Sequence, residues 1–111
     1  MRTIYISGPI TGTTDYEERF NKAADALRKM DMRPVNPVEI GKMVQRRFPD
    51  REITFEEYMT EDLKALITCD GIMMLPGWKD SKGAVVEHYV AKACGKTFVK
   101  IKELADRWRR D

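Results

Sequence analysis

The sequence lacks the features that define several large classes of protein. No stretch approaches the ~20 consecutive apolar residues of a membrane-spanning helix, and the apolar run in residues 1–6 is too short for a signal peptide. The chain has 20 Lys and Arg against 18 Asp and Glu, a net charge of only +2, so it lacks the basic face of a nucleic-acid-binding protein. Its two cysteines have no metal or redox spacing, which predicts reduced, buried Cys69 and Cys94. We therefore expect a soluble, cytoplasmic protein without membrane or nucleic-acid partners.

What the sequence does contain is an alternation of strand and helix signals over 111 residues, enough for one domain spanning residues 1–111. Strands are predicted at 3–6, 32–35, 71–75 and 97–101, and helices begin at Asp15, Asn36, Thr54 and Asp80 or Ser81, with an exposed loop at 45–52 and a last helical segment at 103–110. This alternation predicts an α/β fold with a flavodoxin-like or Rossmann-like, doubly wound parallel sheet of four to five strands.

Two of the helix starts carry strong local signals. Asn36 precedes Pro37 at the first helical position, with Glu39 at the third. Thr54 and Glu57 have the spacing of a capping box. The buried side of the helix that follows Thr54 is predicted to consist of Phe55, Tyr58, Met59, Leu63, Leu66 and Ile67.

The segment 77–95 holds the candidate centre of a site. After a glycine turn it becomes a helix on which Ala84, Glu87, Ala91 and Cys94 fall along one stripe. A carboxylate therefore interrupts a line of small residues that can approach a sheet closely. The positive end of the helix dipole favours an ionised Glu87 in these first turns, where it can act as a nucleophile or a base.

Asp62 is a second acid in an apolar position. It lies four residues after Tyr58 and four before Leu66, and an unpaired buried carboxylate is costly. It is either an acid at the edge of the stripe that reaches solvent or a loop, or a site acid that faces Glu87. Two carboxylates that converge on one pocket are the usual equipment for cleavage of a glycosidic bond.

The turn at 7–14, directly after the first strand, is a further candidate. Glycine-containing turns between a strand and a helix can present backbone N–H groups to a phosphate. Its glycines match neither a Walker loop nor a dinucleotide fingerprint, so a plain connection remains the alternative. In a parallel sheet this turn, Tyr5, the loop 77–81 and Glu87 share the carboxyl edge of the strands.

Several spaced motifs together resemble the nucleoside 2-deoxyribosyltransferase superfamily over most of the chain. They are Tyr5-Ile6-Ser7-Gly8-Pro9-Ile10-Thr11-Gly12, Glu61-Asp62-Leu63 ahead of Cys69-Asp70, Ser81-Lys82-Gly83-Ala84-Val85-Val86-Glu87, and Ala91 to Gly95. The likeness is greatest to short phage and bacterial members without an assigned activity, and to 2'-deoxynucleoside 5'-monophosphate N-hydrolases.

The resemblance implies roles for four residues. Glu87 matches the glutamate that attacks the anomeric carbon, Tyr5 the tyrosine that orients it, and Asp62 the aspartate that contacts the base and supplies a proton. Ser81 stands where family members that act on free nucleosides carry an aspartate and the monophosphate hydrolases a serine. A serine at a helix N-terminus donates to a phosphate that an aspartate would repel.

The expected substrate-binding residues follow from the same match and the two loops. They are Ser7, Gly8, Ile10, Thr11, Gly12, Trp78, Ser81 and Gly83. Trp78 either stacks on a base or closes its loop. No metal and no cofactor are expected, and the partner is a small-molecule nucleotide. Leu104 and Trp108 in the last segment offer an apolar surface for a homodimer or a higher homo-oligomer.

These observations predict N-glycosidic cleavage of a 2'-deoxynucleoside 5'-monophosphate, with water or a second base as the acceptor. The chain departs from the hydrolases at Val85, where they usually carry glycine, and its C-terminal segment is short. A nucleotide-binding module that senses its ligand without turnover is therefore one alternative. A glycohydrolase acting on NAD or ADP-ribose compounds is another, because similar carboxylate chemistry serves both.

Overall fold

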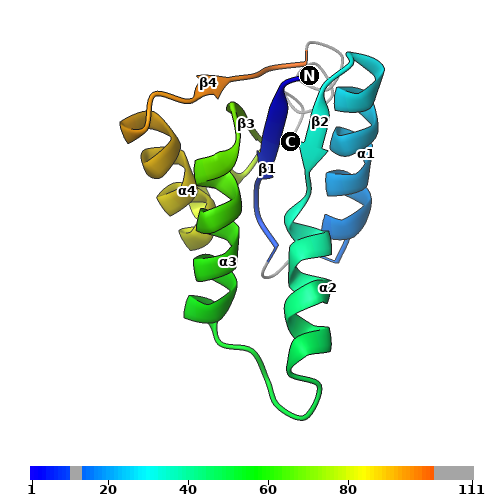
Figure 1. The fold of residues 1–111 in the computed structure, drawn as a ribbon, viewed down its shortest axis with the longest axis vertical. Helices are drawn as coiled ribbons and strands as arrows, with labels where there is room; N and C mark the ends of the chain where they lie inside the picture. The colour runs from blue at the N-terminus through cyan, green and yellow to red at the C-terminus, as the bar shows by residue number, and fades with distance from the viewer. Residues whose placement is uncertain (11–13, 102–111) are drawn as a thin grey trace.

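The computed structural model describes residues 1–10 and 14–101 and has a single α/β domain (Figure 1). Its elements in chain order are β1 (Thr3–Ser7), α1 (Tyr16–Lys29), β2 (Arg33–Val35), α2 (Pro37–Arg47), α3 (Phe55–Thr68), β3 (Gly71–Met74), the short 3-10 helix η1 (Trp78–Asp80), α4 (Lys82–Ala93) and β4 (Thr97–Phe98). None of the helices in the described ranges is long and apolar enough to cross a membrane.

The four strands form one parallel sheet in the order β2-β1-β3-β4. Tyr5 of β1 lies opposite Val35 of β2 on one side and Ile72 of β3 on the other. β1 is therefore an inner strand, and its carboxyl end lies between those of β2 and β3. This arrangement confirms the predicted doubly wound parallel fold, with four strands.

Alternation along β1 divides the core between the two faces of the sheet. Ile4 and Ile6 pack with Phe20 and Leu27 of α1 in one apolar cluster. Tyr5 points to the opposite face and packs with Leu66 of α3 and with residues of α4. Figure 1 shows α1 on one side of the strands and α3 and α4 on the other. Every second residue of β1 consequently faces the α3 and α4 layer.

The local signals for the helix starts at Asn36 and Thr54 are present in the structure. The Asn36 side chain accepts a hydrogen bond from the N–H of Val38, and Pro37 occupies the first helical position. Thr54 and Glu57 form the complete capping box. Asp15 is the N-cap of α1 but makes no side-chain cap bond. The caps of α2 and α3 set where these two helices begin beside the sheet edge.

Several expectations about element ends and burial are wrong. α2 continues to Arg47, so the expected loop at 45–52 begins only at Phe48, because the charged last turn remains helical. β2 omits Met32, and β4 contains two residues rather than five. Phe55 is 40% exposed and Ile67 53% exposed, because the stripe of α3 that contacts the sheet is narrower than its apolar pattern.

The two cysteines differ from expectation and from each other. Cys69 is buried, as predicted, whereas Cys94 is exposed. Cys94 is the C-cap of α4, where the helix ends at Gly95 with φ of 68°, and the chain there has already left the sheet. The last predicted segment, 103–110 with Leu104 and Trp108, lies outside the described residues.

Candidate active site

Glu87 is buried on α4 and is held by two hydroxyl groups from β1. The Tyr5 hydroxyl donates to Glu87 Oε2 at 2.6 Å, and the Ser7 hydroxyl donates to Glu87 Oε1 at 2.7 Å. Tyr5 and Ser7 are two residues apart on a strand and therefore point to the same face, and both are fully buried. Each carboxylate oxygen thus has its own donor, which fixes the orientation of the group.

The surroundings of Glu87 act on its pKa in opposite directions. Burial raises the pKa of Glu87 above its ordinary value, and the hydrogen bonds from Tyr5 and Ser7 reduce that rise without cancelling it because they stabilise the charged form. Burial, followed by the charge of Glu87, raises the pKa of Tyr5 well above its ordinary value. Tyr5 therefore keeps its proton and remains a donor at neutral pH.

Asp62 of α3 is the second buried acid of the site. Burial, the charge of Glu87 and the charge of Glu61, in that order, raise the pKa of Asp62 from its ordinary 3.8 to about 8. A carboxyl group with that pKa is protonated at neutral pH and donates rather than accepts a proton. The structure places Asp62 on the site side of α3, not at the solvent edge of its apolar stripe.

Asp62 and Glu87 both line a cavity of about 290 Å³. Its walls come from the end of β1, the starts of α1 and α4, and the facing sides of α2 and α3. The lining residues are Gly8, Ile10, Tyr16, Glu17, Pro37, Val38, Gly41, Lys42, Gln45, Phe55, Tyr58, Met59, Asp62, Ser81, Gly83, Ala84 and Glu87. A buried, oriented carboxylate and a protonated acid therefore face one space that can hold a small ligand.

The N-terminus of α4 forms one wall of this cavity. Ser81 is the N-cap, and its Oγ accepts a hydrogen bond from the N–H of Ala84 at 3.3 Å, which leaves its own O–H to donate elsewhere. A Cβ at Gly83 would lie 3.2 Å from the sulfur of Met59. Glycine at this position therefore allows α4 to approach α3 closely beside the cavity.

Not all of the expected ligand-binding residues line the cavity. Tyr5 and Ser7 lie behind Glu87 and bond it. Trp78 stacks on the imidazole of His88, with ring centroids 4.3 Å apart and planes 9° apart, and is absent from the lining. Thr11 and Gly12 lie outside the described residues. Of the expected substrate-binding set, Gly8, Ile10, Ser81 and Gly83 line the cavity.

The wall of the cavity formed by α1 and α2 was not predicted from the sequence. Tyr16 and Glu17 from the start of α1, and Gly41, Lys42 and Gln45 from α2, line the cavity. Lys42 Nζ lies 3.9 Å from Glu17 Oε1, so an ion pair links the two helices there. Periodicity marks helix faces that contact a sheet, whereas a face directed at a cavity mixes polar and apolar residues and carries no such signal.

Within the two described ranges, no group of three or more His, Cys, Asp or Glu residues is placed to hold a metal ion. The side chains gathered at the cavity are instead three carboxyl groups, hydroxyl groups, one amide, one lysine and apolar surfaces. Such a set suits proton transfer and nucleophilic attack on an organic ligand.

Comparison with known proteins adds a family and a fold. A family model described as "Domain of unknown function (DUF4406)" matches residues 2–100, and no curated protein matches the chain. Among solved structures, a 2-deoxyribosyltransferase from the psychrotolerant bacterium Bacillus psychrosaccharolyticus is similar with a TM-score of 0.64 and 20% sequence identity. The match covers 86% of this chain and 69% of that one. This likeness shows a shared fold.

Proposed function

Because the chain belongs to the DUF4406 family and has a fold in common with a 2-deoxyribosyltransferase, we propose that it cleaves the N-glycosidic bond of a 2'-deoxynucleoside 5'-monophosphate. The observation that carries this proposal is the pairing of Glu87, held by Tyr5 and Ser7, with Asp62, whose pKa is raised to about 8. One acid is arranged to carry charge and the other to carry a proton, as glycosidic cleavage requires.

In the proposed reaction a Glu87 oxygen forms a bond to C1' while the bond between C1' and the base nitrogen breaks. Asp62 transfers its proton to the departing base. A water molecule then attacks C1', the bond to Glu87 breaks, and the water gives one proton back to Asp62. The products are the free base and deoxyribose 5-phosphate, and both carboxyl groups return to their starting states.

The phosphate preference rests on the start of α4. Ser81 offers a hydroxyl donor there, beside the first backbone N–H groups of the helix, which have no intrahelical partner. The helix dipole adds positive potential at the same point. Lys42 also lines the cavity. A phosphate group meets donors at this wall, whereas a carboxylate at position 81 would repel it.

A second candidate reaction uses the same residues. If another base attacks C1' in place of water, the chain is a base-exchange transferase, and the similarity in fold to a 2-deoxyribosyltransferase favours this alternative. A reaction with a second free base in excess, followed for a new nucleotide, distinguishes transfer from hydrolysis.

The test is direct. The purified protein is incubated with each of the four deoxynucleoside monophosphates, and free base is measured by chromatography. We expect release by the wild type and a loss on the order of 10³-fold or more in Glu87→Gln, because the nucleophile is removed. Glu56→Gln, an exposed acid of α3 outside the cavity, is the matched control and should retain full activity.

Rapid quenching followed by peptide mass spectrometry adds a second measurement. We expect a deoxyribose 5-phosphate adduct on the peptide that contains Glu87. If the wild type binds these nucleotides but releases no base from any of them, the enzyme proposal is wrong and a nucleotide-binding module remains.

A further inference from the structure

The α2 and α3 end of the cavity adjoins a second hollow. This hollow has a volume of about 380 Å³ and lies under the loop between the two helices. Its lining residues are Gln45, Phe48, Pro49, Arg51, Glu52, Ile53 and Tyr58. Gln45 and Tyr58 also line the cavity that contains Glu87. These two side chains therefore border both spaces, with Gln45 exposed and Tyr58 half-buried.

The wall between the spaces consists of side chains joined across two helices. Gln45 Nε2, from the last turns of α2, donates a hydrogen bond to the Tyr58 hydroxyl, from the first turns of α3, at 2.9 Å. A wall of this kind can be shortened by substitution without altering the backbone of either helix. We call the pair Gln45 and Tyr58 the partition.

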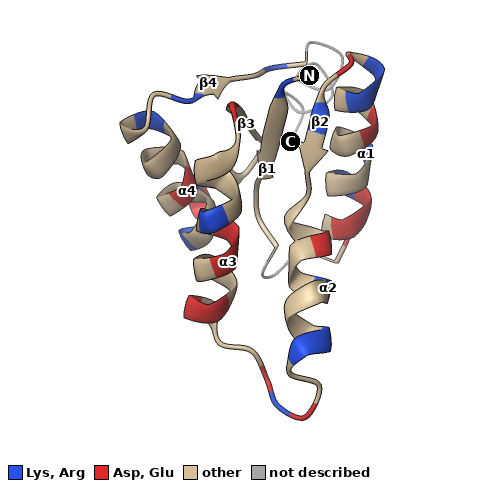
Figure 2. Ribbon diagram, in the orientation of Figure 1, with Lys and Arg blue, Asp and Glu red and all other residues tan. Residues whose placement is uncertain are grey.

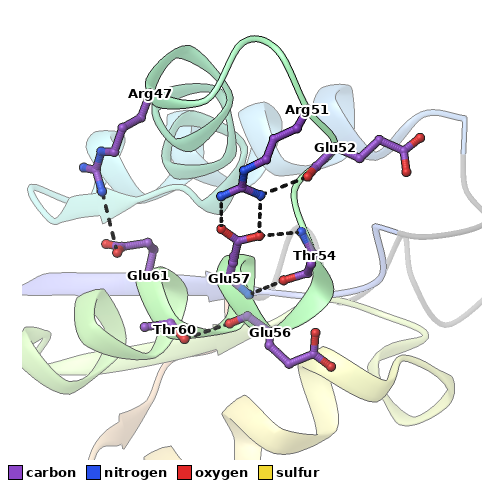
Figure 3. Close-up of polar contacts among 8 residues, drawn as sticks. All are labelled: Arg47, Arg51, Glu52, Thr54, Glu56, Glu57, Thr60 and Glu61. Atoms are coloured by element: carbon purple, nitrogen blue, oxygen red, sulfur yellow. Dashed lines mark hydrogen bonds and ion pairs between the residues drawn. The ribbon is translucent and has the colours of Figure 1, made fainter.

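The loop between α2 and α3 is stabilised by contacts that do not involve the partition. Arg51 makes two hydrogen bonds to the Glu57 carboxylate, at 2.8 and 2.7 Å, and its guanidinium lies 4.4 Å from the centre of the Phe48 ring. Figure 3 shows these bonds together with the Thr54 capping box and the approach of Arg47 to Glu61. The loop and the spacing of the helices should therefore survive loss of the partition.

The charged residues at the ends of α2 and α3 also stabilise these two helices beside the loop. Figure 2 shows basic residues in the last turn of α2 and acidic residues in the first turns of α3. Each set complements the dipole of its own helix, and Arg47 lies 3.8 Å from Glu61 of α3. Arg46, also in this last turn, lines neither hollow and offers a control position.

The partition lies one helical turn from the proposed reacting groups. Tyr58 precedes Asp62 by four residues on α3, and side chains at that spacing are about 6 Å apart on one face. A base released beside Asp62 would extend along α3 for about this length before it met Tyr58. The apolar side chains of Val38 and Met59 also line the cavity and suit the faces of a planar ring.

The partition also offers polar groups to such a ring. The Tyr58 hydroxyl accepts from Gln45, so its own proton can be donated to a ligand. The Gln45 carbonyl oxygen can accept a hydrogen bond. A base edge with an adjacent donor and acceptor matches this pair, and a substituent on that edge would collide with it.

We infer that the Gln45 and Tyr58 partition determines which bases this site accepts, by binding the base edge and excluding bases with a bulky substituent from the second hollow. This inference rests on the proposed function. It assigns the partition a role in specificity and none in bond cleavage, so its loss should change the choice of nucleotide rather than the chemistry.

The experiment compares deoxyadenosine monophosphate with its N6-benzyl derivative in the wild type, Gln45→Ala, Tyr58→Phe and the control Arg46→Ala. Base release gives kcat/KM for each nucleotide, and calorimetry gives Kd for both nucleotides and for deoxyribose 5-phosphate, which has no base. We expect the wild type to favour the unsubstituted nucleotide by about tenfold or more. Gln45→Ala should reduce that ratio by about tenfold.

Tyr58→Phe should weaken binding of the unsubstituted nucleotide through loss of the hydroxyl and leave the Kd for deoxyribose 5-phosphate unchanged. Arg46→Ala should match the wild type throughout. If the wild type releases base but Gln45→Ala leaves the ratio within twofold, the inference is wrong and the proposed function stands. If the wild type binds neither nucleotide, both are wrong. Circular dichroism of each variant checks the fold.

Discussion

Replacing Asp62 with asparagine should stabilise the protein at alkaline pH and change its stability little at acid pH. In the folded protein, burial above all, and then the charges of Glu87 and Glu61, raise the pKa of Asp62 to about 8. In the unfolded chain the pKa returns to about 3.8. Between these two values the folded state holds a proton that the unfolded state has released, so the free energy of unfolding falls as pH rises.

The size of this effect follows from the shift. One pKa unit corresponds to about 1.4 kcal/mol, so full ionisation of Asp62 costs about 6 kcal/mol of stability between pH 4 and pH 9. Water that enters the cavity raises the local dielectric and lowers the cost to about half of that. Asparagine has nearly the same shape and does not ionise. The advantage of Asp62→Asn should therefore be near zero at pH 4 and about 3 to 6 kcal/mol at pH 9.

Urea unfolding followed by circular dichroism at pH values from 4.5 to 9 measures this difference. Asp70→Asn is the control of opposite sign. The N–H and then the hydroxyl of Thr3 hold the pKa of Asp70 below its ordinary value. Asp70 therefore contributes stability above the unfolded pKa that is lost as pH falls. Its asparagine variant should lose stability at neutral pH and gain none at pH 9.

The reasoning would be refuted if the difference in free energy of unfolding between the wild type and Asp62→Asn did not change with pH. Such a result would mean that Asp62 ionises as freely in the folded protein as in the unfolded one. Glu87→Gln offers a second check. This substitution removes the charge of Glu87, the second cause of the raised pKa of Asp62. The pKa of Asp62 should therefore fall, and the loss of stability with rising pH should end at a lower pH. Burial should still hold the pKa of Asp62 above its ordinary value.

Three further predictions concern other parts of the molecule. Tyr5→Phe keeps the ring but removes one donor from Glu87, so we expect a loss of about 1–3 kcal/mol in urea unfolding and base release more than tenfold slower; unchanged values for both would contradict the role of this bond. Leu66→Ala empties a fully buried position under the sheet and should cost about 2–5 kcal/mol in the same assay, whereas a loss below 1 kcal/mol would mean that the core is packed differently. In native protein, Ellman's reagent should modify Cys94 but reach Cys69 only after unfolding, and equal rates at both thiols would contradict the burial described here.

The sequence predicted best the features that short-range chemistry determines. The helix starts at Asn36 and Thr54 depend on residues within three positions of each cap, and both are present as expected. The parallel sheet follows from strands separated by helices. The meeting of Glu87 with Tyr5 also follows, because a parallel sheet gathers the ends of its strands and the starts of the following helices at one edge.

The sequence could not predict features that depend on how much of each helix face packs against the sheet. Ile67 continues the apolar stripe of α3 but lies beyond the edge of the sheet and is exposed. Cys94 continues the stripe of α4 but follows the last turn that packs on the sheet. Gln45 and Lys42 of α2 line the cavity although both are exposed. None of these positions has a local pattern that distinguishes it from an ordinary surface residue.

The division of roles between the two acids depends on β1 rather than on the acids themselves. Both carboxyl groups are buried, and burial raises the pKa of each. Only Glu87 receives hydroxyl donors from the strand, and these stabilise its charged form. Among the described residues Asp62 has no such donors, and burial first, followed by the charge of Glu87, raises its pKa to about 8, so that it retains its proton at neutral pH. Loss of the donors from Tyr5 and Ser7 should therefore weaken the difference between the two acids, so in the proposed reaction β1 helps to set which acid attacks and which donates a proton.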